Sequence, residues 1–366
     1  MTKNRTLLVD KTKFETVEFS DQNLGSLEDG FIRISVGPWA LTANNVTYMV
    51  TGERIGYWHY FAPQAYGIGD DYQGRMPVWG YARVTDSKCE GIKVGQEIYG
   101  FFPITQVLDM KPVKISRTGF QDGSEHRIPL HSLYNSYTMT DKDPSFGVHK
   151  DLQPILRPLF TTSFLIDDTL ADEKFYGAEQ VLVLSASSKT ALGTAYCMKA
   201  RGGIKVTGLT SKGNADFVKG TGFYHTVFDY NSISEMDASV KTVIVDMSGN
   251  GKLLQDLTQH FGESLVYICR VGLSHWDAGE TKPVSNQEYT PKSEFFFAPD
   301  QANKRIKEWG GAGFAERLGA RWLPFLGSAS DWLSVSHSKG EAAVLETYSE
   351  VLSGQASPKN GYIFTL

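Results

Sequence analysis

The sequence predicts an α/β protein in which a β-rich, barrel-type domain precedes a doubly wound parallel sheet. Short strand patterns separated by glycine and proline fill the first third of the chain, as in small closed sheets. After about residue 155, continuous apolar runs alternate with helical stretches, which is typical of strands joined by crossover helices. A length of 366 residues fits about two domains.

In the first part, Ile32–Val36 alternates apolar and polar side chains, which predicts a half-buried strand. Further strands are expected at Pro77–Val84 and Val94–Phe101, joined through a turn at Glu90-Gly91. Glycine corners between such short strands favour a small barrel.

In the second part, the apolar run Val181–Leu184 predicts a strand that is buried on both faces. The expected elements that follow are strands at 204–209, 242–246 and 265–269 and helices at 190–200, 215–218, 252–261, 300–309 and 341–352. Residues 362–366 read as a strand without a nearby partner, so we expect it to return to the first domain. The predicted domains are 1–155 with 303–366, and 156–302.

Composition and charge exclude several functional classes. A net charge of −5 argues against a nucleic-acid scaffold, and no apolar run reaches the roughly 20 residues of a membrane span. The N-terminus lacks an apolar signal core, so we expect a cytoplasmic protein. Three scattered cysteines match neither a disulfide framework nor a zinc site.

The most informative segment is 181–193, which predicts a strand, a turn of small residues and a helix. A helix N-terminus favours bound phosphate, and small side chains allow the backbone to approach a pyrophosphate. The candidate contacts are the side chains of Ser187, Ser188, Lys189 and Thr190. The turn lacks the glycines of the usual dinucleotide fingerprint, so an ordinary strand–helix turn capped by Ser188 stays an alternative.

A nucleoside-triphosphate loop is a rival interpretation, because Lys189-Thr190 follows a strand and Val243–Asp246 lies downstream. That motif requires glycines where this chain has Val183 and Ser188. Without them the loop does not cradle phosphates, so we reject this interpretation.

The second strand of this region bears on the choice of nucleotide. NAD-binding proteins usually carry an acidic residue there for the ribose hydroxyls. This strand ends instead in Thr210, Ser211 and Lys212. A hydroxyl beside a cation suits a 2′-phosphate, which favours NADP(H) over NAD; an exposed polar turn is the alternative.

The chain resembles the medium-chain dehydrogenase/reductase superfamily, in particular its zinc-free quinone oxidoreductase and enoyl reductase branches. The most specific match is Pro77–Val84 followed by Gly91–Gly100, which is similar to the family's P-x-x-G-x-x-x-V and G-x-x-V-G-D-x-V-x-G run. Weaker matches are Gly222–Tyr230 and Val243–Gly249. The resemblance implies a GroES-like substrate domain and a Rossmann domain.

Two departures from the family pattern matter. The catalytic zinc cysteine of other members aligns at or near Ala43, and the four-cysteine zinc lobe is missing, so we expect no metal. The family's glycine-rich turn is serine-rich here, with Lys189 at a usual glycine position. The resemblance therefore implies no particular substrate.

The resemblance also implies catalytic candidates. Tyr48 matches a position beside the nicotinamide, Tyr57 roughly matches the tyrosine of enoyl reductases, and Asn44 is placed to orient a carboxamide or carbonyl. The chain has 17 tyrosines, and buried tyrosines with satisfied hydroxyls are common, so core packing stays an alternative for both.

Further cofactor contacts are implied at Thr162 and at Val271-Gly272, although packing alone would also explain these segments. A homodimer is a further expectation that rests on resemblance alone. Phe295–Phe297 is a candidate edge strand for such pairing.

Two functions remain open at this point. In the first, NADPH reduces an activated C=C or C=O of an apolar carbonyl substrate, such as an enone, quinone or enoyl compound. In the second, the fold binds NADP(H) but serves as a sensor or structural protein on a catalytically degenerate scaffold.

Overall fold

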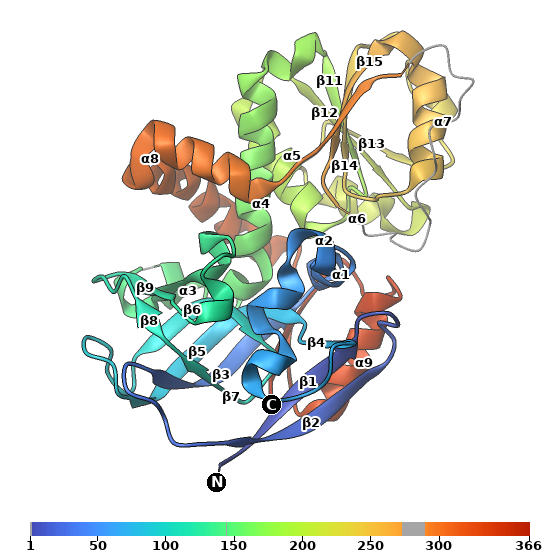
Figure 1. Cartoon of the computed structure of the whole chain (residues 1–366). Helices are drawn as coiled ribbons and strands as arrows, with labels where there is room; N and C mark the ends of the chain where they lie inside the picture. The colour runs from blue at the N-terminus through green and yellow to red at the C-terminus, as the bar shows by residue number, and fades with distance from the viewer. Residues whose placement is uncertain (1, 144, 273–289) are drawn as a thin grey trace. The chain divides into compact units, whose positions relative to one another are not determined.

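The computed structural model describes residues 2–143, 145–272 and 290–366. Contacts divide the chain into two compact units, drawn in Figure 1. Unit 1 comprises Met1–Ile155 and Val335–Leu366, and unit 2 comprises Leu156–Ser334.

Unit 1 is built from antiparallel sheets. One sheet has the order β2-β1-β4, and a larger one has the order β17-β18-β3-β5-β6-β10-β9-β8, with β7 also pairing with β3. The strands are β1 Thr2–Asp10, β2 Val17–Leu24, β3 Ile32–Leu41, β4 Gln73–Gly74, β5 Pro77–Ser87, β6 Glu97–Pro103, β7 Val107–Met110, β8 Pro112–Val113, β9 Gly119–Asp122, β10 Ser136–Met139, β17 Ser334–Lys339 and β18 Asn360–Thr365. The helices are α1 Ala43–Val50, α2 Gly52–Ile55, α3 Ser145–Val148 and α9 Glu341–Leu352, with 3-10 turns η1 Tyr57–Phe61 and η2 Pro63–Tyr66.

The predicted strands of the first part are confirmed, with one shift at a boundary. β3 and β5 pair along most of their length, and β5 also pairs with β6. β6 begins at Glu97 rather than at Val94, because a turn precedes it in which the Gln96 N–H donates to the Lys93 carbonyl (3.2 Å).

The closing strand returns to the first part of the chain, as the sequence predicted. β18 pairs antiparallel with β3, and Tyr362 lies opposite Leu41. The larger sheet of unit 1 therefore contains strands from both ends of the chain.

Unit 2 holds a parallel sheet with the strand order β13-β12-β11-β14-β15-β16 in the described part of the chain. Its strands are β11 Gln180–Leu184, β12 Lys205–Thr210, β13 Thr226–Asp229, β14 Thr242–Asp246, β15 Leu265–Arg270 and β16 Lys292–Phe295. Its helices are α4 Leu152–Asp172, which starts in unit 1, α5 Lys189–Arg201, α6 Ala215–Gly220, α7 Gly251–Phe261 and α8 Ala298–Ser328. α7 covers one face of the sheet, and α4 and α5 cover the other (Figure 1). The predicted doubly wound sheet is confirmed.

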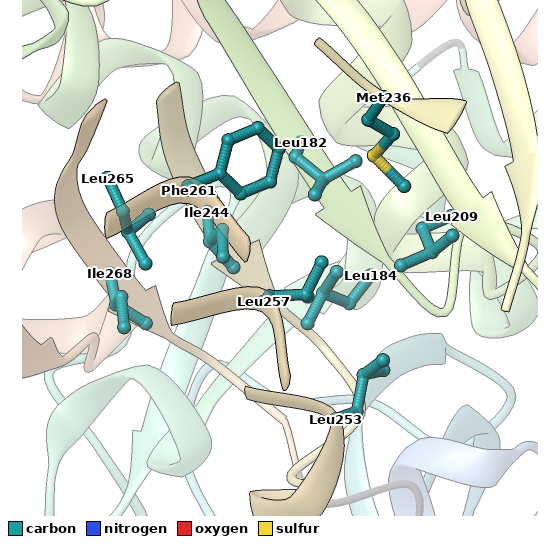
Figure 2. Packing of buried hydrophobic residues seen from close by; sticks show 10 residues of the cluster. All are labelled: Leu182, Leu184, Leu209, Met236, Ile244, Leu253, Leu257, Phe261, Leu265 and Ile268. Atoms are coloured by element: carbon teal, nitrogen blue, oxygen red, sulfur yellow. The ribbon is translucent and has the colours of Figure 1, made fainter. Parts of the chain in front are cut away.

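An apolar core lies between the sheet and α7 (Figure 2). On α7, Leu253, Leu257 and Phe261 recur every four residues and so point to one side of the helix. The cluster comprises Leu182, Leu184, Leu209, Met236, Ile244, Leu253, Leu257, Phe261, Leu265 and Ile268. Burial of these side chains fixes the sheet whose carboxyl-terminal edge carries the candidate cofactor residues.

The structure differs from the sequence prediction at two helices. α4 was not predicted, and α8 continues well beyond the predicted end at residue 309. Contacts also group 303–334 with unit 2, whereas the sequence analysis assigned this segment to the first domain. The reason is packing of α8 on α4, where Arg305 Nε bonds Asp168 (2.5 Å) and the Phe160 and Phe325 rings stack at 4.7 Å.

Candidate functional site

The parallel sheet of unit 2 changes direction at β11. The chain proceeds outward through β12 and β13 on one side, and through β14 and β15 on the other. Loops that follow β11 and β14 therefore lead to opposite sides of the sheet, which is the topology at which open α/β sheets bind nucleotides at the carboxyl ends of their strands. Ser185 to Thr190 and Thr210 to Lys212 follow neighbouring strands, so the topology brings these predicted segments to one edge.

The turn after β11 is tight and leads directly into α5. Ser185 adopts φ +48°, a left-handed conformation that favours glycine. The Ser188 N–H donates to the Ser185 carbonyl (2.8 Å), and Ser188 Oγ accepts from the Ala191 N–H (3.2 Å). Ser188 is thus the N-cap of α5, as the alternative interpretation predicted.

Capping does not remove the anion-binding potential of this turn. A cap satisfies one of the N–H groups in the first helical turn, while the others still point toward the space beyond the helix end. The capping interpretation and the phosphate interpretation are therefore compatible.

Ser187 connects the turn to the end of β12. Its Oγ accepts a hydrogen bond from Asn214 Nδ2 (3.2 Å) and lies 3.4 Å from Thr210 Oγ1. The structure therefore brings together Ser187 and Thr210, both predicted from the sequence. Asn214 was missed; its only signal was its place in the polar loop that leads from β12 into α6.

The backbone of the turn is held in place by its neighbours. The Ala186 N–H donates to the Leu209 carbonyl (3.1 Å), and the Tyr224 hydroxyl donates to the Ala186 carbonyl (3.0 Å). A Cβ atom on Gly208 would lie 3.0 Å from the Ala186 Cβ, so β12 approaches the turn closely. The small residues here are required by packing as well as by any ligand.

Lys189 is the first residue of α5, and its side chain is half-buried. Enclosure by the protein disfavours the charged ammonium and lowers the pKa of Lys189 to about 8. Thr190 follows, and its carbonyl accepts a hydrogen bond from Ser163 Oγ of α4 (2.7 Å). Ser211 and Lys212 are exposed beyond the end of β12.

The other predicted cofactor residues of unit 2 are engaged in local bonds. The Thr162 hydroxyl donates to the Pro158 carbonyl one turn earlier in α4 (3.2 Å). The N–H groups of Val271 and Gly272 both donate to the Asp246 carbonyl (2.9 and 3.2 Å). This pairing holds the segment after β15 against the end of β14, at the same sheet edge as the turn after β11.

In unit 1, the predicted catalytic tyrosines contact each other. The Tyr48 and Tyr57 ring centroids are 4.7 Å apart, and both side chains are buried. The Tyr48 hydroxyl accepts from Trp79 Nε1 (3.0 Å), and the Tyr57 and Tyr134 hydroxyls share a hydrogen bond (2.9 Å). Trp79 and Tyr134 were not identified from the sequence, which gives no signal that they reach these hydroxyls.

Burial governs the acidity of these phenols. Desolvation raises the pKa of Tyr48 to about 12, although hydrogen bonds with Trp79 and Asn44 oppose the shift. Desolvation likewise raises the pKa of Tyr57. Both phenols therefore stay protonated at neutral pH, the form that donates a proton. Asn44 is half-buried on α1 beside them.

Several features with functional meaning are absent from the described residues. No three His, Cys, Asp or Glu side chains there form a group that could hold a metal ion. None of the described helices is both long and apolar enough to span a membrane. Cys89, Cys197 and Cys269 are free thiols. Zinc independence and a homodimer stay predictions.

Comparisons with known proteins place the chain in a family. The family model "Protein of unknown function (DUF2855)" matches residues 39–357, so the chain belongs to this family. No curated protein matches the sequence.

Solved structures show the same fold across the whole chain. CurA from Vibrio vulnificus in complex with NADPH is 14% identical, with a TM-score of 0.63 over 99% of this chain and 98% of that chain. The mycobacterial Rv1454c complexed with NADPH is 12% identical, with a TM-score of 0.59 over 99% and 100%. The quinone oxidoreductase from Coxiella burnetii is 12% identical, with a TM-score of 0.53 over 100% of both chains. The chain therefore shares its fold with two proteins that are complexes with NADPH and with a quinone oxidoreductase.

Proposed function

We propose that this member of the DUF2855 family is an NADPH-dependent, zinc-independent reductase of an activated C=C or C=O bond. The observation that carries the proposal is the turn after β11, which joins a buried parallel strand to a helix at the point where the sheet changes direction. CurA and Rv1454c, which share the fold, are complexes with NADPH. Because fold alone does not fix function, the residues of this chain have to support the cofactor.

The residues of the turn fit a dinucleotide. The first turn of α5 offers N–H groups and a partial positive charge to a pyrophosphate, and Ser187, Ser188, Lys189 and Thr190 add hydroxyl and ammonium donors. Gly208 and Ala186 keep the backbone of the turn close to β12. Thr162, Val271 and Gly272 are proposed to line the cofactor further along.

The nucleotide is proposed to be NADP(H). After β12, exposed Ser211 and Lys212 take the place of the acidic residue that accepts ribose hydroxyls in NAD-binding proteins. Thr210 and Asn214 hold Ser187 beside this position. An ammonium and hydroxyls suit a 2′-phosphate, which an acidic residue would repel.

Bound NADPH would supply a hydride, so the protein has to orient the substrate and deliver a proton. Tyr48 is proposed as the proton donor, with Tyr57 as the second candidate and Asn44 as a positioning residue. The substrate class is an enone, quinone or enoyl compound with an apolar body, which suits the aromatic side chains around Tyr48 and Tyr57. A homodimer is expected.

One observation favours a second function, that of an NADP(H)-binding sensor. Tyr57 is buried and bonded to Tyr134, and Tyr48 is buried and bonded to Trp79, so both hydroxyls already have protein partners. A protein that binds NADPH without turnover of enones or quinones would have this second function.

The test is isothermal titration calorimetry of NADPH and NADH against the wild type, Lys212→Ala and Lys219→Ala. Lys219 is the matched control, because it is an exposed lysine on α6 a few residues further along the same unit. We expect NADPH to bind more tightly than NADH, and Lys212→Ala to reduce that preference about tenfold, as for loss of a charge-assisted hydrogen bond.

The outcomes separate the proposals. Failure of both nucleotides to bind the wild type would overturn the reductase and the sensor together. Equal effects of Lys212→Ala and Lys219→Ala would reject the 2′-phosphate assignment alone. If NADPH binds, oxidation of NADPH at 340 nm in the presence of enones and quinones distinguishes the reductase from the sensor.

A further inference from the structure

Unit 1 buries an arginine, Arg75, for which the described residues provide no hydrogen-bond acceptor. Arg75 lies between β4 and β5, and only 1% of it is exposed. Within the described residues, none of its three guanidinium nitrogens has a hydrogen-bond partner. Burial lowers the pKa of Arg75 to about 10, so the side chain is charged at neutral pH.

Arg127, also buried in unit 1, shows how the same fold treats an arginine that is paired. Its Nη1 donates to Asp122 Oδ2 (2.8 Å) and to the Tyr137 hydroxyl (2.9 Å). Its Nε and Nη2 donate to Asn135 Oδ1 and the Tyr134 carbonyl, each at 2.8 Å. All three nitrogens are therefore satisfied.

No spare carboxylate compensates Arg75 among the residues that the structure describes. Asp122 is committed to Arg127 through Oδ2, and its Oδ1 accepts from the Ser124 N–H and hydroxyl (3.0 and 2.7 Å). The close neighbour of Arg75 is the Tyr66 ring, 4.6 Å from the guanidinium carbon. A cation–π contact offsets part of the cost of burial but leaves the N–H donors without acceptors.

The remaining neighbours of Arg75 supply no negative charge. The Tyr66 hydroxyl lies 3.4 Å from His126 Nε2. Burial lowers the pKa of His126, and the charges of Arg127 and Arg75 act in the same direction. Asp109, which also acts on Tyr66, is paired with Arg33 (2.7 Å), so one positive charge, that of Arg75, has no carboxylate partner here.

We propose that Arg75 is the anchor of a carboxylate-binding site inside unit 1, with Tyr66 beside it. A guanidinium group presents parallel N–H donors that match the two oxygens of a carboxylate, and the single excess charge matches a monoanion. The carboxylate is either a free small ion or the acidic end of the substrate. Only the second source rests on the proposed function.

The first experiment needs no nucleotide. Protein labelled with ¹⁵N-arginine is titrated with sodium formate and sodium acetate at constant ionic strength, and Arg75→Met identifies the Arg75 Nε resonance. We expect this resonance to shift saturably while that of Arg127 stays in place. The melting temperature should rise by about 2–4 °C in the wild type and not in Arg75→Met.

Three results would overturn the site: an unmoved Arg75 resonance, equal stabilisation of the wild type and Arg75→Met, or the same saturable shift with sodium chloride alone. If Arg75→Met does not fold, Arg75→Lys identifies the resonance, and the wild-type titration decides.

A second experiment distinguishes the sources once a reducible enone is known. A carboxylated enone is compared with its methyl ester. A KM that Arg75→Met raises at least tenfold for the acid but not for the ester assigns the site to the substrate. Unchanged KM values together with the formate effect assign it to a free ion. Because the resonance titration requires no turnover, it tests the carboxylate site even if the enzyme assay fails.

Discussion

The candidate regions of the two units use their polar side chains differently. At the sheet edge of unit 2, Ser211 and Lys212 are exposed, and Ser187, which accepts a bond from Asn214, is half-buried. In unit 1, Tyr48 and Tyr57 are buried and their hydroxyls are bonded to Trp79 and Tyr134. The groups beyond β12 are thus exposed, whereas in unit 1 the Tyr48 hydroxyl accepts a bond from Trp79 and the Tyr57 hydroxyl shares one with Tyr134. The cofactor proposal is therefore better supported than the identity of the proton donor.

The largest expected effect tests whether Tyr48 donates the proton although its side chain is buried. Tyr48→Phe should lower kcat about 10²–10⁴-fold if the phenol delivers the proton. It should also cost about 1–3 kcal/mol of stability, because the Trp79 N–H loses its acceptor. Steady-state kinetics and urea unfolding measure the two effects. Tyr57→Phe is the matched control, and a larger loss of kcat there would transfer the role to Tyr57.

The next largest effect tests whether the aromatic side chains around Tyr48 and Tyr57 are tightly packed core residues. Phe101 is fully buried and its ring contacts Tyr48, Tyr57 and Tyr134. Phe101→Ala should lower the free energy of unfolding by about 3–5 kcal/mol, since it deletes a buried ring and leaves a cavity. Urea denaturation measures this loss. A cost below about 1 kcal/mol would show that the cluster is loosely packed and able to admit a substrate.

A smaller effect concerns unit 2: the affinity for NADPH should depend on pH through Lys189. With the pKa of Lys189 at about 8, the ammonium loses its proton as pH rises through that value. NADPH affinity should then fall by up to about tenfold per pH unit above 8. In the free protein, the unfolded chain holds this proton more tightly, so the contribution of Lys189 makes stability rise as the pH goes from about 8 to about 10.5 and level off above that. Calorimetry at several pH values, with Lys189→Met as the variant, checks the affinity.

For Lys189→Met, we expect an affinity for NADPH that does not change with pH over the same range. Lys219→Ala should retain the wild-type profile, since Lys219 lies away from the turn on α6. Identical profiles for Lys189→Met and the wild type would exclude Lys189 from the pyrophosphate site.

The smallest effect concerns a residue that sequence analysis missed. Asn214→Ala removes the hydrogen bond from Asn214 Nδ2 to Ser187, which is worth about 0.5–1.5 kcal/mol. NADPH should bind a few-fold more weakly, because Ser187 is less well positioned, and the melting temperature should fall by about 2–4 °C. Asn231→Ala, which alters an exposed asparagine of the same unit, should leave binding unchanged.

The sequence predicted the central strands of the parallel sheet, because they are apolar runs, but not the half-buried β13 or the exposed β16. β11, β12, β14 and β15 lie within one or two residues of the predicted ranges. α4 was missed because Pro154 and Pro158 interrupt the usual helical signal. The first proline lies in the first turn, where its missing N–H costs little, and the second lies inside the helix.

The sequence predicted a helix that ends at Trp309. In the structure the backbone of α8 does depart from helical geometry next to this residue, but the helix then continues. Gly310 has φ +73°, which is not helical, yet the chain resumes helix beyond it. A sequence pattern detects such a break but not the resumption, because that depends on aromatic packing with distant residues such as Phe160.

The candidate site was predictable only in part, for a similar reason. Ser187 and Thr210 could be paired from the topology of neighbouring parallel strands. The bond from Trp79 to Tyr48 joins residues 31 positions apart on different elements, and nothing in local pattern specifies it. The same holds for Arg75, whose lack of an acceptor is visible only once its neighbours are in place.

The return of β18 to β3 has a consequence for synthesis on the ribosome. Unit 1 takes strands from both ends of the chain, and all of unit 2 lies between them. At about 5–20 residues per second, translation of the intervening segment lasts on the order of tens of seconds. During that time the edge of β3 that β18 later covers is open to other strands. Unit 2 is complete in the nascent chain before β18 is made, so we expect unit 2 to fold before unit 1.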